Sequence, residues 1–260
     1  MLAVERRKKI SNIIVDRKSI TVIELANYFQ VSGETIRNDL EKLEKQGVLV
    51  RTYGGATLVQ GTAKEEMTVE EREVINADGK SRIGAFAASL VRDGETVFLD
   101  ASTSSLQVAK SLKEKRSVTV ITNSQRVVNE LCTCPNVNLV CTGGQLRAKN
   151  MSYVGRMAEE NIKNHYYANK CFFSCRGVNL ARGLMDSNEQ EAEIKKAMIK
   201  YSETAVFLCD KSKLGILGVP MVAKLEDVDV LITDVQLDEE WSKAMNDNEI
   251  EVYSVDSMTE

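Results

Sequence analysis

Short apolar runs alternate with amphipathic segments from residue 96 to residue 255 of this 260-residue chain. The apolar runs have the length of strands and lie at 96–99, 118–121, 137–141, 170–175, 205–208, 229–233 and 251–255. Segments with helical periodicity lie between most of them, at 103–115, 124–131, 153–164, 188–201 and 238–246. Strands buried on both faces are apolar throughout, and the helices that cover them are amphipathic. The alternation predicts an α/β domain with a mostly parallel sheet covered on both faces.

The first 56 residues have a different pattern, which predicts a small α+β domain of three helices and a hairpin. The first helix is expected at 4–16, with an apolar stripe made by Val4, Ile10, Ile13 and Ile14. Thr21 and Glu24 have the spacing of a capping box, which opens a second helix ending near Gln30. We expect a first domain at 1–58, a linker at 59–75 and a second domain at 76–260.

A third helix is expected after the turn Val31-Ser32-Gly33. Ser32 is placed to cap it, and Gly47 is expected to end it after Gln46. Two strands, at 48–51 and 53–58, then form the hairpin.

The third helix is amphipathic, and its polar side has an unusual composition. On a helical wheel, Ile36, Leu40 and Leu43 share one face, while Thr35, Arg37, Asn38 and Lys42 lie opposite or on the shoulders. Such side chains hydrogen-bond phosphates and base edges. A short helix, a tight turn and a helix of this kind are typical of a helix-turn-helix, with the hairpin as a wing whose glycines let the backbone approach DNA. A three-helix cap with a solvated outer face is the alternative that this pattern leaves open.

The charge of the chain is uneven. Residues 1–56 hold ten Lys/Arg and seven Asp/Glu, a net of +3, whereas the remaining 204 residues hold 24 and 31, a net of −7. A basic head on an acidic body favours a polyanionic partner for the head, although such a charge is also common in domains that bind nothing.

The N-terminal segment resembles the DeoR-type winged helix of bacterial repressors. The shared residues are Glu24-Leu25-Ala26, Val31-Ser32, Thr35-Ile36-Arg37, Asp39-Leu40, Leu43-Glu44, Gly47, Arg51 and Gly54-Gly55-Ala56. The resemblance implies binding to double-stranded operator DNA, with contacts from Thr21, Ser32, Thr35, Arg37, Asn38, Lys42, Arg51, Tyr53 and Gly54. The family usually has Arg where Asn38 stands and His where Tyr53 stands, so a distinct operator preference is expected from these two positions.

Polar loops follow the carboxyl ends of three predicted strands, at 100–105, 122–124 and 142–145. Ligands of open α/β sheets bind at that edge. The first loop enters a helix, where hydroxyl and N–H groups suit an anion, and Asp100 is expected to accept sugar hydroxyls. Lys213, after a later strand, suits a phosphate. Each loop has an ordinary alternative as a helix cap or turn, and only their recurrence at one edge favours a phosphorylated polyol.

Residues 72–255 resemble the sensor domain of the DeoR family, whose fold is similar to ribose-5-phosphate isomerase and glucosamine-6-phosphate deaminase. Arg72, Asn76 and Lys80 match one pattern of the family, and residues 100–104 match its D-x-G-T-T loop with Ser102 in place of Gly. The resemblance implies a small phosphorylated sugar as effector, with these binding residues: Asp100, Ser102, Thr103, Ser104, Thr122, Asn123, Ser124, Gly143, Gly144, Asn188, Glu189 and Lys213.

A sugar-phosphate isomerase or deaminase with a DNA-binding head is the rival hypothesis. Its chemistry needs an acid/base pair over the substrate, and the single histidine, His165, is expected in a helix away from the loops. The six cysteines have no zinc-type spacing. We therefore expect no catalytic residues, metal or cofactor, and predict a transcriptional regulator that acts as a repressor and as a homodimer or higher homo-oligomer. Without a membrane-length apolar run or signal sequence, a cytoplasmic location is expected.

Overall fold

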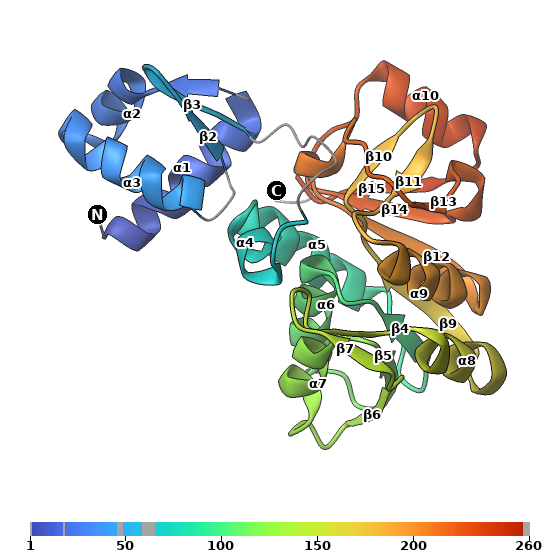
Figure 1. Ribbon diagram of the computed structural model, residues 1–260. Helices are drawn as coiled ribbons and strands as arrows, with labels where there is room; N and C mark the ends of the chain where they lie inside the picture. The colour runs from blue at the N-terminus through green and yellow to red at the C-terminus, as the bar shows by residue number, and fades with distance from the viewer. Residues whose placement is uncertain (1, 18, 46–48, 59–65, 257–260) are drawn as a thin grey trace. The chain divides into compact units, whose positions relative to one another are not determined.

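The computed structural model describes residues 2–17, 19–45, 49–58 and 66–256 (Figure 1). The chain divides into two compact units, residues 1–77 and 78–260. Part of the stretch expected to be a linker, 66–75, contains helix α4 (Val69–Val74). Val74 and Ile75 pack against the apolar core of the first unit, so this stretch is not purely a connection.

The first unit consists of short helices and a three-stranded antiparallel sheet. Its elements are α1 (Ala3–Arg17), β1 (Ser19–Thr21), α2 (Val22–Phe29), α3 (Gly33–Lys45), β2 (Leu49–Thr52), β3 (Gly55–Leu58) and α4. The three helices and the hairpin are confirmed, whereas β1 was not predicted. β1 pairs with β3, and the sheet order is β1-β3-β2.

The core of the first unit lies between its helices and this sheet. The side chains that are fully or almost fully buried in it are Ile10, Ile14, Leu25, Ile36, Leu40, Leu43 and Leu49. The prediction for Val4 was wrong, since its side chain is 70% exposed on the first turn of α1. The expected helix stop at Gly47 lies outside the described residues.

The second unit is built on a parallel sheet of seven strands, in the order β15-β14-β12-β9-β4-β5-β6. In chain order, the elements are α5 (Ala77–Ser89), β4 (Thr96–Leu99), α6 (Thr103–Leu112), β5 (Val118–Thr122), α7 (Gln125–Leu131), β6 (Val137–Cys141), β7 (Gln145–Arg147), β8 (Ser152–Val154), α8 (Arg156–His165), β9 (Ala168–Phe173), β10 (Gly177–Asn179), β11 (Gly183–Met185), α9 (Glu189–Lys200), β12 (Ser202–Cys209), β13 (Met221–Ala223), β14 (Val230–Thr233), α10 (Glu239–Asp247) and β15 (Glu251–Ser254).

Two apolar cores cover the two faces of this sheet, as the alternation in sequence predicts. Along β9, Phe172 packs with α5, α6 and α7, while its neighbours Cys171 and Phe173 pack with α8, α9 and α10. The side chains alternate because successive residues of a strand point to opposite faces. The α/β architecture with helices on both faces is confirmed.

Three predictions of detail differ from the structure. The helix expected at 153–164 begins only at Arg156, because Ser152–Val154 form β8 and Gly155 has a φ of 88°. The hairpin of β7 and β8 was not predicted. Nor was the small antiparallel sheet β10-β11-β13, whose strands have only three residues each.

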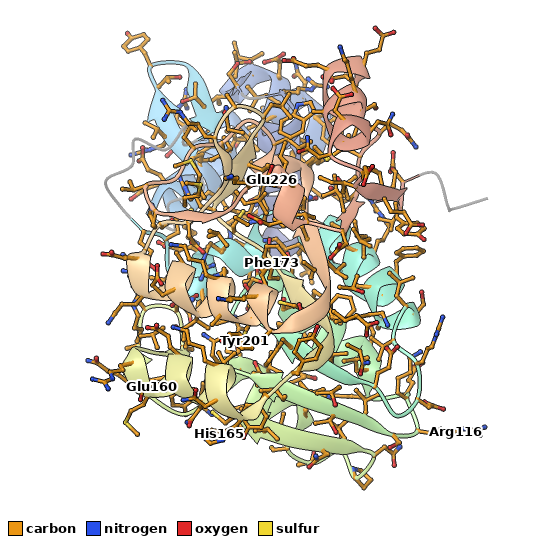
Figure 2. All side chains as sticks on the ribbon, turned by 90° about the vertical axis from the view of Figure 1, so that its right-hand side faces the viewer. Arg116, Glu160, His165, Phe173, Tyr201 and Glu226 are labelled. Carbon is orange, nitrogen blue, oxygen red and sulfur yellow. The ribbon has the colours of Figure 1, made fainter. Side chains whose placement is uncertain are left out.

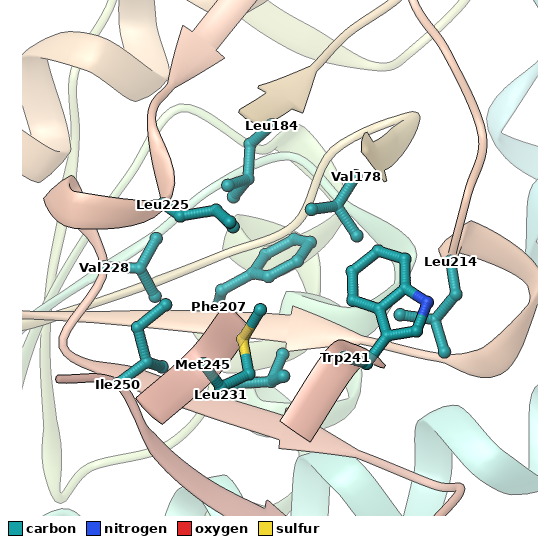
Figure 3. Close-up of a pocket in the computed structure, with 10 residues that line it drawn as sticks. All are labelled: Val178, Leu184, Phe207, Leu214, Leu225, Val228, Leu231, Trp241, Met245 and Ile250. Atoms are coloured by element: carbon teal, nitrogen blue, oxygen red, sulfur yellow. The ribbon is translucent and has the colours of Figure 1, made fainter. Parts of the chain in front are cut away.

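A small gap remains in the apolar core beside α10 (Figure 3). Phe207, Trp241 and Met245 are among the side chains that line it, and its lining is entirely apolar. Its volume of about 10 Å³ has room for one water-sized sphere. It is therefore a packing defect and not a site for a sugar.

No helix in the described ranges has the length and apolar character needed to cross a bilayer.

Candidate functional site

The turn between α2 and α3 is built from local hydrogen bonds. At the start of α2, Thr21 Oγ1 accepts from Glu24 N (3.2 Å) and Glu24 Oε2 accepts from Thr21 N (2.9 Å), which confirms the capping box. Gln30 ends α2 in the left-handed conformation, with a φ of 53°. Ser32 Oγ then accepts from Thr35 N (3.2 Å) at the start of α3. The two helices thus meet at a short turn, as a helix-turn-helix requires.

One side of α3 holds the helix to its unit and the other faces solvent. Besides its apolar side chains, α3 buries Asp39, whose carboxylate binds Arg6 Nε (2.5 Å) and Arg7 Nη1 (3.3 Å) of α1. The exposed face carries Arg37, Asn38 and Lys42, together with Ser32 and the half-buried Thr35. Arg37 makes an exposed ion pair with Glu34 at 3.5 Å. The predicted polar face is therefore open to a partner.

The hairpin of β2 and β3 presents Tyr53 at its tip, fully exposed. Its two glycines differ in role. A Cβ at Gly54 would meet nothing within 4 Å, whereas a Cβ at Gly55 would overlap the carbonyl oxygen of Ile20 and lie 2.7 Å from Thr21 Cα. Gly55 is thus required by the close approach of β1 to β3, whereas Gly54 is exposed and its carbonyl oxygen accepts from Val22 N at 2.9 Å. Arg51 of β2 is exposed and bonded to Glu44 of α3.

In the second unit, buried polar side chains lie at the carboxyl ends of the parallel strands. They are Thr142 after β6, Thr122 at the end of β5, Asp100 after β4, Ser174 after β9, Asp210 after β12, and Thr233 and Asp234 at the end of β14. All are 5% exposed or less. The structure thus brings together the predicted loops that follow β4, β5, β6 and β12, and it adds Ser174, Thr233 and Asp234, which were not predicted at this edge.

Asp100 binds protein groups on several sides. Its carboxylate accepts from Ser102 N (3.1 Å), Ser105 Oγ (2.6 Å) and Ser174 N (3.3 Å). It also lies 3.4 Å from the ammonium of Lys195 in α9. Both oxygens of the Asp100 carboxylate are thus engaged by protein groups, which the expectation that Asp100 accepts sugar hydroxyls did not include. Asp100 instead holds the loop after β4 to β9 and α9.

The loop after β4 forms the N-terminal end of α6. Ser102 Oγ caps the helix by accepting from Ser105 N at 3.1 Å, so its hydroxyl is already used. Thr103 and Ser104 follow in the first turn, and both are buried. Ser104 Oγ has no hydrogen-bond partner among the described residues, although less than 1 Å² of it is exposed. Burying an unsatisfied hydroxyl is unfavourable, so this atom is a candidate ligand contact.

Among the residues at the end of β5, some side chains are used in supporting hydrogen bonds and one keeps an unused polar atom. Thr122 Oγ1 donates to Leu99 O (2.7 Å), and Ser124 Oγ caps α7 by accepting from Val127 N (3.3 Å). Asn123 donates from Nδ2 to Tyr153 O at 3.1 Å. Its Oδ1 is buried, and no hydrogen-bond partner is found for it within the described ranges. Thr122 and Ser124 therefore support the loop, while Asn123 keeps an unused acceptor.

The loop after β6 changes direction at two glycines. Gly143 and Gly144 have φ values of 66° and 110°. A Cβ at Gly144 would also lie 2.7 Å from Val154 O and 2.9 Å from Ala158 Cβ. This glycine is therefore needed for the packing of the loop against β8 and α8.

The remaining expected effector residues are partly occupied by structural contacts. Asn188 Oδ1 caps α9 by accepting from Gln190 N (3.0 Å) and Glu191 N (3.3 Å), and Glu189 is exposed in its first turn. Lys213 Nζ donates to Cys175 O (2.8 Å) and lies 3.8 Å from Asp210 Oδ2.

Asp210 is a charged group inside the second unit. Its burial alone would raise its pKa, but the charges of Lys213 and Lys80, together with the hydrogen bonds from Ser212, outweigh this, so the pKa lies below the usual value. Lys80 is itself buried. The edge of the sheet thus contains fixed positive charge beside β12.

A buried charge cluster on α9 was not predicted. Lys195 Nζ binds Asp186 Oδ2 at 2.8 Å as well as Asp100, and Glu191 Oε1 binds Arg147 of β7 (2.6 Å) and Ser152 of β8. Burial alone would lower the pKa of Lys195, but Asp186, Asp100 and Glu191 raise it above its usual value. A signal was present in the sequence, because these charged residues share the apolar stripe of α9 with Ile194 and Met198.

The single histidine is exposed and three of the cysteine thiols are buried. His165 is exposed at the end of α8, shortly before β9 begins, and so lies at the amino edge of the sheet; Figure 2 shows it at the surface, with Phe173 inside the unit. Burial raises the pKa of the Cys175 thiol to about 12 and also raises those of Cys171 and Cys209. Within the described ranges, no three His, Cys, Asp or Glu side chains are placed to hold a metal.

The first unit is a helix-turn-helix with an open polar face, and the second is an α/β unit with polar loops at one edge of its sheet. This combination defines a DNA-binding regulator with a sensor domain. Sequence comparison agrees: the DeoR-like helix-turn-helix domain matches residues 6–62, and the DeoR C terminal sensor domain matches residues 75–235. The chain belongs to the DeoR family of transcriptional regulators. The family and the names of its relatives indicate a DNA-binding regulator and not an enzyme.

Three relatives illustrate the similarity. The uncharacterized HTH-type transcriptional regulator YulB of Bacillus subtilis is 42% identical over 255 residues, which cover 98% of each chain. A putative aga operon transcriptional repressor of Escherichia coli O157:H7 is 32% identical, covering 88% of this chain and 86% of that protein. The transcriptional repressor AccR of Agrobacterium fabrum is 32% identical, covering 88% and 89%.

Among solved structures, ribose 5-phosphate isomerase A from Methanocaldococcus jannaschii shares 18% identity over 54% of this chain and 55% of its own, with a TM-score of 0.40. A likeness of this size carries no argument about activity.

Proposed function

We propose that the chain represses genes of sugar or carbohydrate metabolism and that a phosphorylated sugar bound to the second unit controls its affinity for operator DNA. Two of the relatives above are named as repressors, which supports the first part. The observation that carries the second part lies at the carboxyl edge of the sheet. There, just beyond the ends of two adjacent strands, Ser104 Oγ in the first turn of α6 and Asn123 Oδ1 in the loop after β5 are buried and lack hydrogen-bond partners among the described residues.

The phosphate is proposed to bind at the start of α6. The first-turn N–H groups of a helix have no intrahelical partner and lie at its positive end, which favours an anion. Thr103 and Ser104 add hydroxyl donors in that turn, and Ser104 Oγ gains the partner that it lacks. Lys213 supplies a positive charge from the loop after β12, two strands away from β4.

The sugar hydroxyls are proposed to bind beside the phosphate, over the loops after β5 and β6. Asn123 Oδ1 accepts from a hydroxyl group, and the backbone at Gly143 and Gly144 comes close to the ligand. Asp100 and Ser102 act indirectly, because their polar atoms hold the loop in shape. Thr122, Ser124 and Asn188 have the same supporting role.

On the DNA side, α3 is proposed to enter the major groove with Ser32, Thr35, Arg37 and Asn38 toward the bases. Lys42, Thr21 and the wing residues Arg51, Tyr53 and Gly54 are proposed to lie along the phosphates. A single head of this size reads few base pairs, and operators of this class are read by paired heads, so we propose a homodimer or a higher homo-oligomer. The effector then shifts the population of head arrangements, with a coupling of about 1–3 kcal/mol.

Arg37→Ala is expected to weaken specific operator binding about tenfold to a hundredfold, because an arginine that reads a base pair contributes about 1–3 kcal/mol of discrimination. The operator is first selected from a randomised duplex pool with the wild-type protein, and affinities are then measured by fluorescence anisotropy. Arg116→Ala removes the same charge from an exposed position of the second unit and should leave the affinity unchanged. Equal affinity of Arg37→Ala and wild type would rule out the proposed recognition helix.

At least one phosphorylated sugar is expected to bind the wild-type protein in calorimetric titration, and Ser104→Ala is expected to bind it about tenfold more weakly. A hydrogen bond to a charged group contributes roughly 1.5–3 kcal/mol, which sets the size of the loss. Ser111→Ala is the matched control, since Ser111 lies in the same helix and its hydroxyl donates to Gln107 O at 3.3 Å. The effector proposal fails if no phosphorylated sugar of a broad panel binds, and the placement fails if Ser104→Ala binds normally.

A further inference from the structure

One ion pair joins the recognition helix to the wing. Glu44, in the last turn of α3, accepts two hydrogen bonds from Arg51 of β2. Its Oε1 accepts from Arg51 N at 2.8 Å and its Oε2 from Arg51 Nε at 2.6 Å. These bonds lower the pKa of Glu44, the bond from the Arg51 backbone N–H being the largest cause. Glu44 therefore fixes both the backbone and the side chain of the same wing residue.

The geometry leaves part of the Arg51 guanidinium available. An arginine has five N–H donors in a rigid planar fork, and Glu44 engages only the one on Nε. Within the described part of the chain, the two terminal nitrogens of Arg51 have no partner, and its side chain is 43% exposed. An arginine held in this way keeps its outer edge directed to solvent and can form further hydrogen bonds with a phosphate.

We propose that Glu44 is a positioning residue for DNA binding. It holds the guanidinium of Arg51 so that its terminal nitrogens bind a DNA phosphate, and it fixes the start of the wing relative to α3. Holding the side chain in advance removes rotamer entropy that a free arginine loses on binding. The inference rests on the proposed contact of Arg51 with DNA and adds the residue that prepares this contact.

A positioning role and a purely electrostatic role of Glu44 lead to opposite effects of Glu44→Gln on the affinity for DNA. Glu44 is a negative charge close to the face proposed to meet DNA, and DNA is a polyanion. If Glu44 acted through its charge alone, Glu44→Gln would strengthen DNA binding. If Glu44 positions Arg51, the same change weakens binding, because the charge-assisted bond to Nε is lost and the guanidinium moves freely.

The test measures the affinity of the full-length protein for a fluorescently labelled random-sequence DNA duplex over a range of salt concentrations. A phosphate contact does not depend on sequence, so this probe is sufficient. Glu44→Gln is expected to weaken binding roughly three- to fivefold, the range of one partly exposed ion pair. Arg51→Ala is expected to weaken binding and to reduce the salt slope by about 1. The double variant should bind no more weakly than Arg51→Ala alone, since both changes remove one coupled contact.

Two further variants test whether the effect depends on the position of the negative charge, and they provide a second test if one variant does not fold. Glu41→Gln removes the same charge one turn earlier on α3 and should leave binding equal or tighter. Glu44→Asp keeps the charge but is one methylene shorter, so it should also weaken binding. It provides the same test if Glu44→Gln does not fold, as checked by circular dichroism.

Two outcomes would contradict the proposal. Unchanged or tighter binding by a folded Glu44→Gln or Glu44→Asp variant, beside weaker binding by Arg51→Ala, would overturn the positioning role. Normal binding and salt slope for Arg51→Ala would instead overturn the proposed wing contact itself, and the inference with it.

Discussion

Replacement of Lys195 by methionine is expected to lower the free energy of unfolding of the second unit by about 3–5 kcal/mol. Lys195 is 4% exposed, and its ammonium lies 2.8 Å from Asp186 and 3.4 Å from Asp100. Methionine fills much of the same space but removes the cation that both carboxylates contact. An uncompensated buried charge is far less favourable than the intact pair.

Urea unfolding followed by the fluorescence of Trp241 measures this effect in the second unit alone. Trp241 is the single tryptophan of the chain and packs against the core beside α10. Lys196→Met is the matched control, because Lys196 is the next residue, is exposed and, within the described ranges, pairs only with Glu193, at 2.7 Å across one turn. It should change stability by less than about 1 kcal/mol. If the two variants lost similar amounts of unfolding free energy, the buried ion pairs of Lys195 would contribute no more to stability than the exposed pair of Lys196.

Replacement of Gly55 by alanine is expected to destabilise the first unit by at least about 1–3 kcal/mol, the range for overpacking a tight interior. The new Cβ would overlap the carbonyl oxygen of Ile20 and lie 2.7 Å from Thr21 Cα. Both neighbours are backbone atoms of β1, which cannot move aside as the end of a flexible side chain can. Thr21 also begins the capping box of α2, so the displacement reaches the helix-turn-helix.

Hydrogen exchange of the backbone amides of β1 and β3 locates this effect, since exchange reports local opening of the sheet. Gly54→Ala is the matched control, because a Cβ there would meet nothing within 4 Å. It should leave exchange in the sheet unchanged. The unfolding transition reported by Trp241 should be the same in both variants. If Gly55→Ala exchanged as slowly as wild type, the close approach of β1 to β3 would not require a glycine.

The regular elements and the outline of both domains could be predicted because they depend on local pattern. Period-2 and period-3.6 spacing reports which face of a strand or helix is buried, and the capping box of Thr21 and Glu24 is complete within four residues. The elements that were missed have weak local signals. β1 has three residues, and its partner β3 lies more than thirty residues later, at Gly55–Leu58.

The candidate effector site was predictable as a region but not atom by atom. The carboxyl ends of parallel strands meet at one edge, so the loops at 100–104, 122–124 and 143–144 were expected to converge. Which oxygen remains available depends on what folds against it. Asp100 is occupied by Ser174 and Lys195, 74 and 95 residues further along the chain, while Ser104 Oγ is left without a partner among the described residues.

The amino-acid sequence by itself determined the two-part organisation, the helix-turn-helix and the alternation of strands and helices. These features follow from the spacing of apolar residues and from short-range capping. Only the tertiary structure decided the roles of individual polar groups: that Asp100 supports a loop, that Gly55 and not Gly54 is required for packing, and that Glu44 holds Arg51. The physical reason is that hydrogen bonding and burial are properties of atoms brought together from distant segments, and spacing along the chain does not record them.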